Sequence, residues 1–298
     1  METIKTFAEN ITLPSEAIET VLPVCEKINA AYAEEYSAIK TNAFNSDSVE
    51  NSNEKIMDVI KAIAEKEDVH KDLATLAVLL MLGVDAKARY AEKNLSDEVY
   101  YASVKDIAIW AKTCMKEFGR VGLFEFAWVM SFIRADIIRL HRLEFHEIKF
   151  DPVDVWEKHG ITVKKGDRVI NLHIPEDGPM KHEDVIESYR RAYQHFGREG
   201  NAAFVCHSWL LYPGLLDFLP ENSNIRAFAE DFEIIEYGQR KNHGELWRVF
   251  GKRRSYDPAE LPRNTALQRG LADYLASHDN VTGEGYGIFV FDGEKVIK

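Results

Sequence analysis

The chain has 298 residues, of which 46% are hydrophobic and 29% charged, and its formal net charge is −12. This is the composition of a globular protein that is long enough for two domains with proper cores. The acidic balance disfavours nucleic acid as a partner, because neutralising phosphates requires a basic surface. No apolar run reaches the roughly 20 residues of a membrane helix, so we expect no membrane partner.

The three cysteines, Cys25, Cys114 and Cys206, lie far apart in the sequence. Their spacing fits neither a disulfide framework nor a zinc site. The ten histidines also lack paired ligand spacing next to a carboxylate. The N-terminal residues show no basic and apolar pattern of a secretory signal. We therefore expect a cytoplasmic protein with free thiols and no metal.

The first half of the chain has apolar residues at the three- and four-residue steps of buried helix faces. Ser96 is an expected helix N-cap and Gly119 an expected helix end. A polar segment over 41–54, rich in Asn and Ser, predicts an exposed loop. The expected helices cover residues 14–28, 56–63, 73–94 and 97–118.

Residues 123–145 are the most apolar part of this half and predict one long helix, the axis of a helical bundle. Four basic residues lie within it, namely Arg134, Arg139, His141 and Arg142. We interpret them as a solvated polar face paired with Asp136 and Glu144. The alternative is that they bind an anion.

The pattern changes at about residue 150, where short apolar runs begin to alternate with amphipathic segments. Alternation of this kind predicts a mixed, partly parallel sheet covered by helices. The fold class is therefore α+β, with a helical N-terminal bundle over 1–150 and a mixed α/β domain over 151–298. The expected strands are 169–174, 202–211, 232–237, 246–250 and 286–291, and the expected helices are 181–196, 215–229 and 265–277.

The apolar run over 202–211 is the expected central strand, and it contains three types of reactive side chain. Alternation places Cys206 and Ser208 on one face and His207 on the other. If the strand over 169–174 is its parallel neighbour, His173 and His207 approach each other at the carboxyl edge, where α/β sheets bind ligands.

Several roles remain open for these groups. His207 or His173 could accept a proton from an amine, and Ser208 or Tyr212 could return one to a thiolate. Cys206 could be a nucleophile, but His207 cannot be its base because neighbours on a strand point to opposite faces. The alternative is structural: Cys206 as a small buried residue, and His207 with Ser208 in a hydrogen-bonded core network.

Several segments resemble a bacterial family of N-acyltransferases. Residues 82–90, 103–110, 122–128 and 139–145 are similar to its helical N-terminal domain, and residues 172–175, 206–211, 222–225 and 265–269 to its GNAT-like C-terminal domain. The matching segments follow the same order, from about residue 70 to 291. The resemblance implies a GNAT-like fold and transfer of an acyl group from acetyl-CoA or another acyl-CoA to an amine.

The phosphate-binding loop expected of a GNAT-like domain is missing. Between the expected strand and helix stands Pro175-Glu176-Asp177-Gly178-Pro179, where prolines remove N–H donors and acids repel phosphates. The segment over 239–270 has eight basic residues against three acidic ones and offers another site for an anion. The alternative is a solvated loop. The residues that could contact the anionic carrier are Arg263, Thr265, Gln268, Arg269 and Asn224, with Gln268 and Asn224 equally suited to capping and packing.

Two functions therefore stay open. The first is an acyltransferase that uses acyl-CoA and an amine acceptor. The second is a non-catalytic binding or interaction protein with a degenerate acetyltransferase-like fold. The helical half could cover a ligand pocket or serve as the surface of a homodimer.

Overall fold

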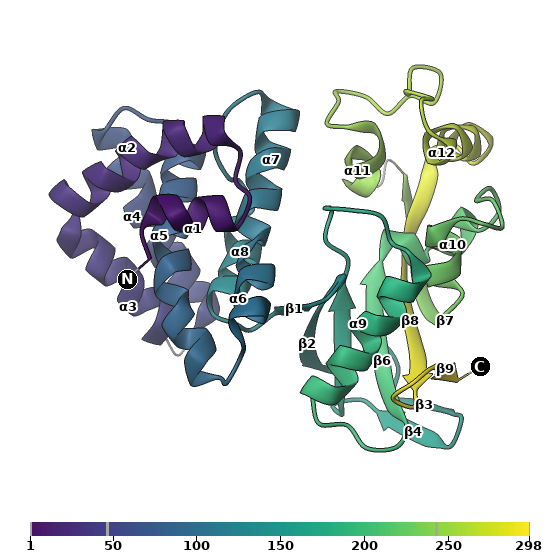
Figure 1. The fold of residues 1–298 in the computed structure, drawn as a ribbon. Helices are drawn as coiled ribbons and strands as arrows, with labels where there is room; N and C mark the ends of the chain where they lie inside the picture. The colour runs from purple at the N-terminus through teal and green to yellow at the C-terminus, as the bar shows by residue number, and fades with distance from the viewer. Residues whose placement is uncertain (1, 46–47, 242–243, 298) are drawn as a thin grey trace. The chain divides into compact units, whose positions relative to one another are not determined.

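The computed structural model describes residues 2–45, 48–241 and 244–297. It divides into two compact units (Figure 1). The first comprises Met1–Leu140 together with the short segment Pro175–Asp177, and the second comprises His141–Ile174 and Gly178–Lys298. Each unit is described below by itself.

The first unit is built around α5, a long helix whose residues from Ala74 to Gly83 are all buried. Helices α1, α2, α4, α6, α7 and α8 all pack against α5. Its Gly83 lies against the ring of Phe7 in α1. The elements are α1 (Ile4–Asn10), α2 (Ser15–Ala31), α3 (Ala33–Asn45), α4 (Val49–Lys66), α5 (Lys71–Glu92), α6 (Asp97–Val104), α7 (Asp106–Phe118), α8 (Phe126–Ile133) and β1 (Ile138–Leu140).

The long helix expected over 123–145 is wrong. Helix α8 ends at Ile133, Ala135 has a left-handed backbone with a φ of 53°, and β1 and β2 (Leu143–Lys149) follow. The apolar residues of this stretch fit helical spacing and buried strands equally well, so periodicity could not separate the two. The bundle axis is α5 instead.

The solvated polar face expected for this stretch is also wrong for its arginines, because Arg134, Arg139 and Arg142 are buried. Arg134 donates to the carbonyl of Ala43 and to the side chains of Ser52 and Asn53. Burial of a guanidinium requires such partners.

The loop expected over 41–54 is largely helical, since α3 extends to Asn45 and α4 begins at Val49. Residues 46–47 lie outside the described part of the chain. The polar side chains of this segment are bonded locally: Asn42 donates to the carbonyl of Ala38, and Ser52 donates to that of Asn42. Tertiary contacts thus override the weak helix propensity of Asn and Ser.

The second unit contains a mixed sheet in the order β2-β5-β6-β8-β7, with β9 paired to β8. Strands β5 and β6 are parallel, as expected, and the other pairs are antiparallel. The remaining strands are β5 (Arg168–His173), β6 (Ala202–Ser208), β7 (Glu233–Lys241), β8 (Val281–Phe291) and β9 (Val296–Ile297), and a separate hairpin consists of β3 (Val155–Lys158) and β4 (Ile161–Lys164).

Both faces of the sheet are covered for part of its length. On one face, Tyr189 of α9 (His182–His195) packs against Phe204 and Phe289, with ring centroids 5.8 and 4.6 Å apart. On the other face, Trp156 and Val163 of the β3–β4 hairpin belong to one apolar cluster with strand residues, listed as Val169, Val205, Ile288 and Val290.

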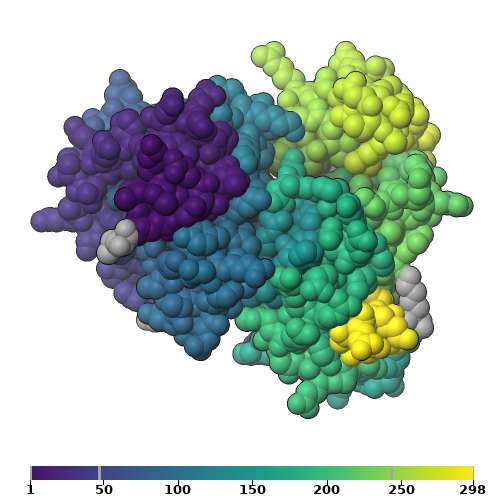
Figure 2. Space-filling view, viewed as in Figure 1, coloured from purple at the N-terminus to yellow at the C-terminus, as the bar shows by residue number. Residues whose placement is uncertain are grey.

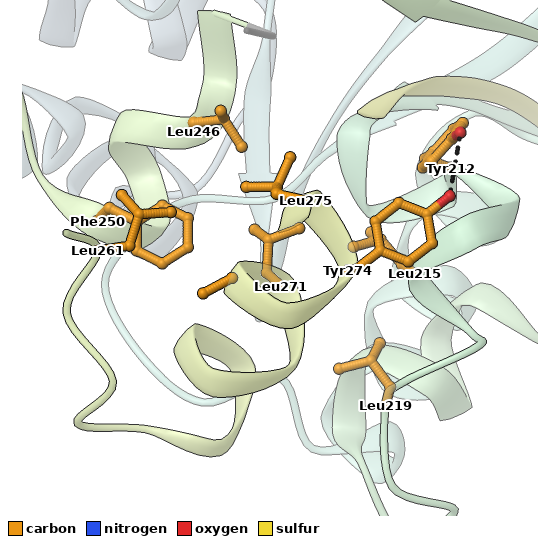
Figure 3. Close-up of a cluster of buried hydrophobic side chains, with 10 residues drawn as sticks. Tyr212, Leu215, Leu219, Leu246, Phe250, Leu261, Leu271, Tyr274 and Leu275 are labelled. Carbon is orange, nitrogen blue, oxygen red and sulfur yellow. Dashed lines mark hydrogen bonds between the residues drawn. The ribbon is translucent and has the colours of Figure 1, made fainter. Parts of the chain in front are cut away.

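The C-terminal part of the second unit forms its own apolar cluster (Figure 3). Leu271 and Leu275 of α12 pack with Leu246 and Leu215. The outer face of α12 lies at the surface (Figure 2, yellow-green). The elements are η1 (Trp209–Leu211), η2 (Pro213–Leu215), α10 (Asn224–Ala229), η3 (Gly244–Leu246), α11 (Trp247–Phe250) and α12 (Ala266–Ser277).

Two of the expected strands differ from the structure. The strand expected over 246–250 is wrong, because η3 ends at Leu246 and α11 covers Trp247–Phe250. Leu246 and Phe250 enter the same cluster, and a spacing of four residues fits one face of a helix or of a strand, so the pattern could not separate the two. Strand β6 ends at Ser208 rather than at residue 211, because the Ser208 hydroxyl accepts from the backbone N–H of Leu210 and begins a 3-10 turn.

Two glycines of β8 allow neighbouring backbone segments to pack closely against this strand. A side chain at Gly283 would collide with the carbonyl oxygen of Gly238 in β7, and one at Gly285 would collide with the carbonyl oxygen of Leu211 in η1. Backbone therefore packs directly on backbone at these two positions, where no other residue fits.

The buried position of α5 generates a stability prediction. Replacing the fully buried Leu79 with Ala should lower the free energy of unfolding by about 2 to 5 kcal/mol, because the cavity is enclosed by other helices. Urea denaturation followed by circular dichroism measures the effect. The control is Val49→Ala, at a position that is 53% exposed, where we expect less than about 0.5 kcal/mol. Equal losses in the two variants would contradict the central role of α5.

Candidate functional site

The sheet of the second unit opens where its two parallel strands end. The register joins Ile170 with Phe204 and Asn171 with Val205. Among the described residues it goes no further, although β5 continues to His173 and β6 to Ser208. The carboxyl ends of β5 and β6 thus stop bonding each other at a position where α/β sheets commonly bind ligands.

Three polar side chains meet on β2 and β5 next to this opening. The Nδ2 atom of Asn171 lies 2.9 Å from Nε2 of His146 and 2.9 Å from Nε2 of His173. The two imidazole Nε2 atoms are 3.1 Å apart. His146 lies opposite Asn171 in the β2–β5 register, so all three side chains project from one face of the sheet.

His173 is held neutral by its surroundings. Burial, and to a smaller extent the neighbouring ring of His146, lowers the pKa of His173 from 6.5 to about 3. A neutral imidazole retains one nitrogen that can accept a hydrogen bond or a proton. At neutral pH His173 can therefore orient a substrate or accept a proton, but burial makes it a weak base.

His207 lies on the same face as His173, one strand further along, because Val205 pairs with Asn171. Its side chain is 55% exposed, and its Nε2 lies 3.9 Å from Oε1 of Glu284 in β8. Its ring stacks on that of Tyr286 with centroids 5.9 Å apart. Glu284 also forms an ion pair with Arg240 of β7.

Cys206 is buried in the second unit, and Ser208 is bonded to the backbone that follows it. Cys206 is buried on the opposite face from His207, and burial raises the pKa of its thiol, which disfavours the nucleophilic thiolate. The Ser208 hydroxyl accepts from the N–H of Leu210 at 3.2 Å and caps η1.

Tyr212 lies in the C-terminal apolar cluster. Its hydroxyl accepts from Nε2 of Gln239 at 2.6 Å and lies 3.4 Å from the hydroxyl of Tyr274. Asn224 is the first residue of α10, after its N-cap Ser223.

The four expected carrier contacts near α12 lie together, and each bonds within the protein. Thr265 and Gln268 form the capping box of α12, and the amide of Gln268 also donates to the carbonyl of Val249. Arg263 pairs with Asp273 at 2.6 Å. Arg269 donates to the carbonyls of Arg263 and Asn264. These contacts stabilise the segment before α12, and binding an anion there would require some of them to be exchanged.

The connection between β5 and α9 is well supported despite its two prolines. The carbonyl of Gly178 accepts from Arg142, and so does that of Pro179, at 2.8 and 3.0 Å. The connection leads directly into α9, which begins at His182. The His182 imidazole is held by the buried carboxylate of Asp231, with Nε2 and Oδ2 3.0 Å apart.

Sequence reasoning missed several residues of this site. His146 directly follows the helix wrongly expected over 123–145, although the apolar–polar alternation from Leu143 to His146 is a strand signal. Glu284 lies in the glycine-rich first half of β8, which is atypical of a strand and precedes the strand expected over 286–291. Tyr286 is the first residue of that expected strand, but its pattern gives no sign of a role in the site. Tyr286 has a buried hydroxyl with no hydrogen-bond partner among the described residues, and burial raises its pKa to about 12.

The described residues contain no group of three or more His, Cys, Asp or Glu side chains arranged to bind a metal ion. Among the same residues, no helix has the length and apolar character needed to cross a membrane.

The environment of Cys206 predicts a slow reaction with iodoacetamide. In the native protein at pH 7.5 its alkylation should be far slower than in urea, because the thiol is buried and its pKa is raised. Mass spectrometry of the peptide that contains Cys206 measures the two rates. Rapid native alkylation would instead indicate an exposed thiolate and support the hypothesis that Cys206 is a nucleophile.

The lowered pKa of His173 predicts a loss of stability in acid. Unfolded His173 takes up a proton as the pH falls through about 6.5, whereas the folded residue stays neutral down to about 3, so stability declines across this interval. Urea denaturation at pH 7.5 and 5.0 should show a smaller acid loss in His173→Asn than in the wild type. The control is the exposed His207→Asn. An imidazole of His173 that titrates near 6.5 by NMR would contradict this prediction.

Comparison with known proteins agrees with this architecture. Residues 2–135 match the model of the N-acyltransferase N-terminal domain, and residues 137–289 match that of the GNAT-like C-terminal domain. No curated protein matches the chain.

Solved structures share the fold at low sequence identity. An acyltransferase mutant in complex with octanoyl-CoA has a TM-score of 0.73 and 19% identity over 96% of this chain and 86% of that one. An acyltransferase in complex with decanoyl-CoA and teicoplanin has a TM-score of 0.72, with the same identity and coverage. A third, in complex with decanoyl-CoA, has a TM-score of 0.70 at 16% identity, again over 96% of this chain and 86% of that one.

These matches confirm the family resemblance and the α+β fold class that the sequence predicts. Two domain models in the expected order account for nearly the whole chain. The chain belongs to the family defined by the GNAT-like C-terminal domain, here preceded by the N-acyltransferase N-terminal domain.

Proposed function

We propose that this protein is an acyltransferase that transfers an acyl group from acyl-CoA to an amine. The observation that carries the proposal is the opening between the carboxyl ends of β5 and β6, with His173 and His207 on one face beside it. The family of the chain and the acyl-CoA complexes of its structural neighbours support the same ligand.

The opening suits the pantetheine arm of CoA. This arm is extended and contains two amide groups, so it can bond to strand edges as an added strand does. The parallel ladder stops at Asn171 and Val205, which leaves a place for such an arm between β5 and β6. The thioester would then lie near the polar face that contains His207.

The phosphates of CoA would lie at the connection from β5 to α9. A helix that follows a strand presents backbone N–H groups and the positive end of its dipole to an anion. The alternative site in the basic segment over 239–270 is less favourable, because Arg240 pairs with Glu284, Arg248 with Glu245 and Arg263 with Asp273.

His207 is the better candidate for the general base, because it is exposed and has a carboxylate nearby. In direct transfer the amine nitrogen attacks the thioester carbonyl carbon, a C–N bond forms and the C–S bond breaks. The proton lost by the amine passes to His207 and then, directly or through water, to the sulfur of the departing CoA. Neutral His173 would orient the reacting groups.

The acyl chains to test first are octanoyl and decanoyl, because these are present in the neighbouring complexes. The acceptor that we propose is a primary amine. The three cysteines are free and buried, which suits a reducing compartment, and we therefore propose the cytoplasm as the place of action.

Thermal unfolding with and without ligand tests acyl-CoA binding. Octanoyl-CoA at about 100 times its dissociation constant should stabilise the folded protein by about 2.7 kcal/mol and raise the melting midpoint. Acetyl-CoA and CoA are the comparison ligands, and ATP is the control for unspecific binding of phosphates. An unchanged midpoint with every acyl-CoA at millimolar concentration would refute the proposal and leave a non-catalytic protein.

Turnover of octanoyl-CoA tests the role of His207. With a panel of primary amines and detection of the released thiol, His207→Ala should lower the rate about 100-fold or more while the ligand still raises the melting midpoint. The matched control is His195→Ala, at the last residue of α9. A His207→Ala variant with wild-type turnover would exclude His207 as the base.

A further inference from the structure

Two buried arginines flank the turn between β1 and β2, and neither has a part in the proposed chemistry. Arg139 lies in β1, and Arg142 lies in the turn just before β2. Their residues are only 9% and 8% exposed. Burying a guanidinium is costly unless it is paired, so the partners of these two side chains indicate what they are for.

Arg139 binds the connection between β5 and α9 through Asp177. Its Nη1 lies 2.7 Å from Oδ2 of Asp177 and its Nη2 lies 3.0 Å from Oδ1, which is a two-pronged ion pair. Lys105 adds a second cation, with Nζ 3.4 Å from Oδ2. These contacts agree with the assignment of Pro175–Asp177 to the helical unit.

Arg142 binds the next residues of the same connection through their backbone. Its Nη2 donates to the carbonyl of Gly178 and its Nε donates to that of Pro179. Its own N–H donates to the hydroxyl of Ser188 in α9 at 2.9 Å. Arg142 therefore fixes the last turn of the connection and its direction into α9.

These contacts address one part of the electrostatic problem that the sequence poses, namely the charge of Asp177. Glu183 and Asp184 in the first turn of α9 are separate carboxylates. An unpaired Asp177 would repel the phosphates of CoA at the beginning of α9. Paired with Arg139 and Lys105, the carboxylate carries two cations within ion-pair distance. The carbonyls of Gly178 and Pro179 likewise accept hydrogen bonds from the guanidinium of Arg142.

We propose that Arg139 and Arg142 are positioning residues that hold the β5–α9 connection in a form that accepts the phosphates of CoA. They replace, through side chains from another part of the sequence, the glycine-rich loop that is missing between β5 and α9. This inference rests on the proposed function, since it concerns the same acyl-CoA.

Binding of two thioesters separates this role from a general loss of structure. Octanoyl-CoA and octanoyl-pantetheine share the arm and the acyl chain, but only the first has the phosphates. Arg139→Gln should raise the dissociation constant of octanoyl-CoA about tenfold, because Asp177 then keeps only the longer ion pair with Lys105 beside the phosphates. The constant of octanoyl-pantetheine should change by less than about twofold. Isothermal titration measures both.

A second variant tests the electrostatic cause. The double variant Arg139→Gln with Asp177→Asn lacks both charges, so affinity for octanoyl-CoA should return to within about threefold of the wild type. Lys105→Gln removes the more exposed cation, so the dissociation constant of octanoyl-CoA should rise about threefold, which is less than in Arg139→Gln. This variant keeps the test valid if Arg139→Gln does not fold. Arg142→Gln should also weaken octanoyl-CoA selectively.

The matched control is Arg120→Gln, which breaks the ion pair with the buried Asp72 in the helical unit. It should lower the melting midpoint without changing the ratio of the two dissociation constants. If Arg139→Gln and Lys105→Gln lowered the affinity for both thioesters equally, the positioning role would be overturned while the proposed function would stand. A wild-type protein that binds neither thioester would overturn the proposed function as well.

Discussion

The second unit depends on the unequal pairing of its central strand. Strand β6 bonds antiparallel to β8 over its full length, from Ala202 to Ser208, but parallel to β5 at only two positions. Phe204 and Val205 are buried on opposite faces, and a shift of β6 by one residue would exchange the faces on which they pack. The strand is therefore fixed by β8 and by its two covered faces, and its edge toward β5 can remain open near the end.

The charge of the protein is arranged locally, and its total gives little information on the ligand. With a net charge of −12 the chain repels a polyanion such as CoA at long range. In its basic segment over 239–270, three of the eight cations pair with nearby carboxylates. At the β5–α9 connection cations neutralise acceptors instead: Arg139 and Lys105 pair with the carboxylate of Asp177, and Arg142 binds two backbone carbonyls. Binding of an anion by such a protein depends on the placement of a few paired groups.

The sequence predicts the fold class and a partly parallel sheet, because these follow from apolar runs and alternation. It places His173 and His207 at one edge only on the condition that β5 and β6 are parallel neighbours, which the structure meets. It does not predict the partners of Arg139, since Asp177 is 38 residues away and no local pattern joins them. The sequence also predicts a helix over 138–140, where the structure has strand β1. All three residues are buried, so the apolar pattern shows neither the period of a helix nor that of a half-exposed strand.

The glycines of β8 limit how this sequence can change over time. At Gly283 and Gly285 a neighbouring backbone oxygen occupies the space that any side chain would need. Surface helices such as α12 can exchange most of their outer residues, whereas these two positions tolerate only one of the twenty amino acids. Distant relatives that retain this strand packing should therefore keep the two glycines after most of the surrounding sequence has changed. The pair offers a marker for aligning chains whose overall identity is too low for an alignment by sequence alone.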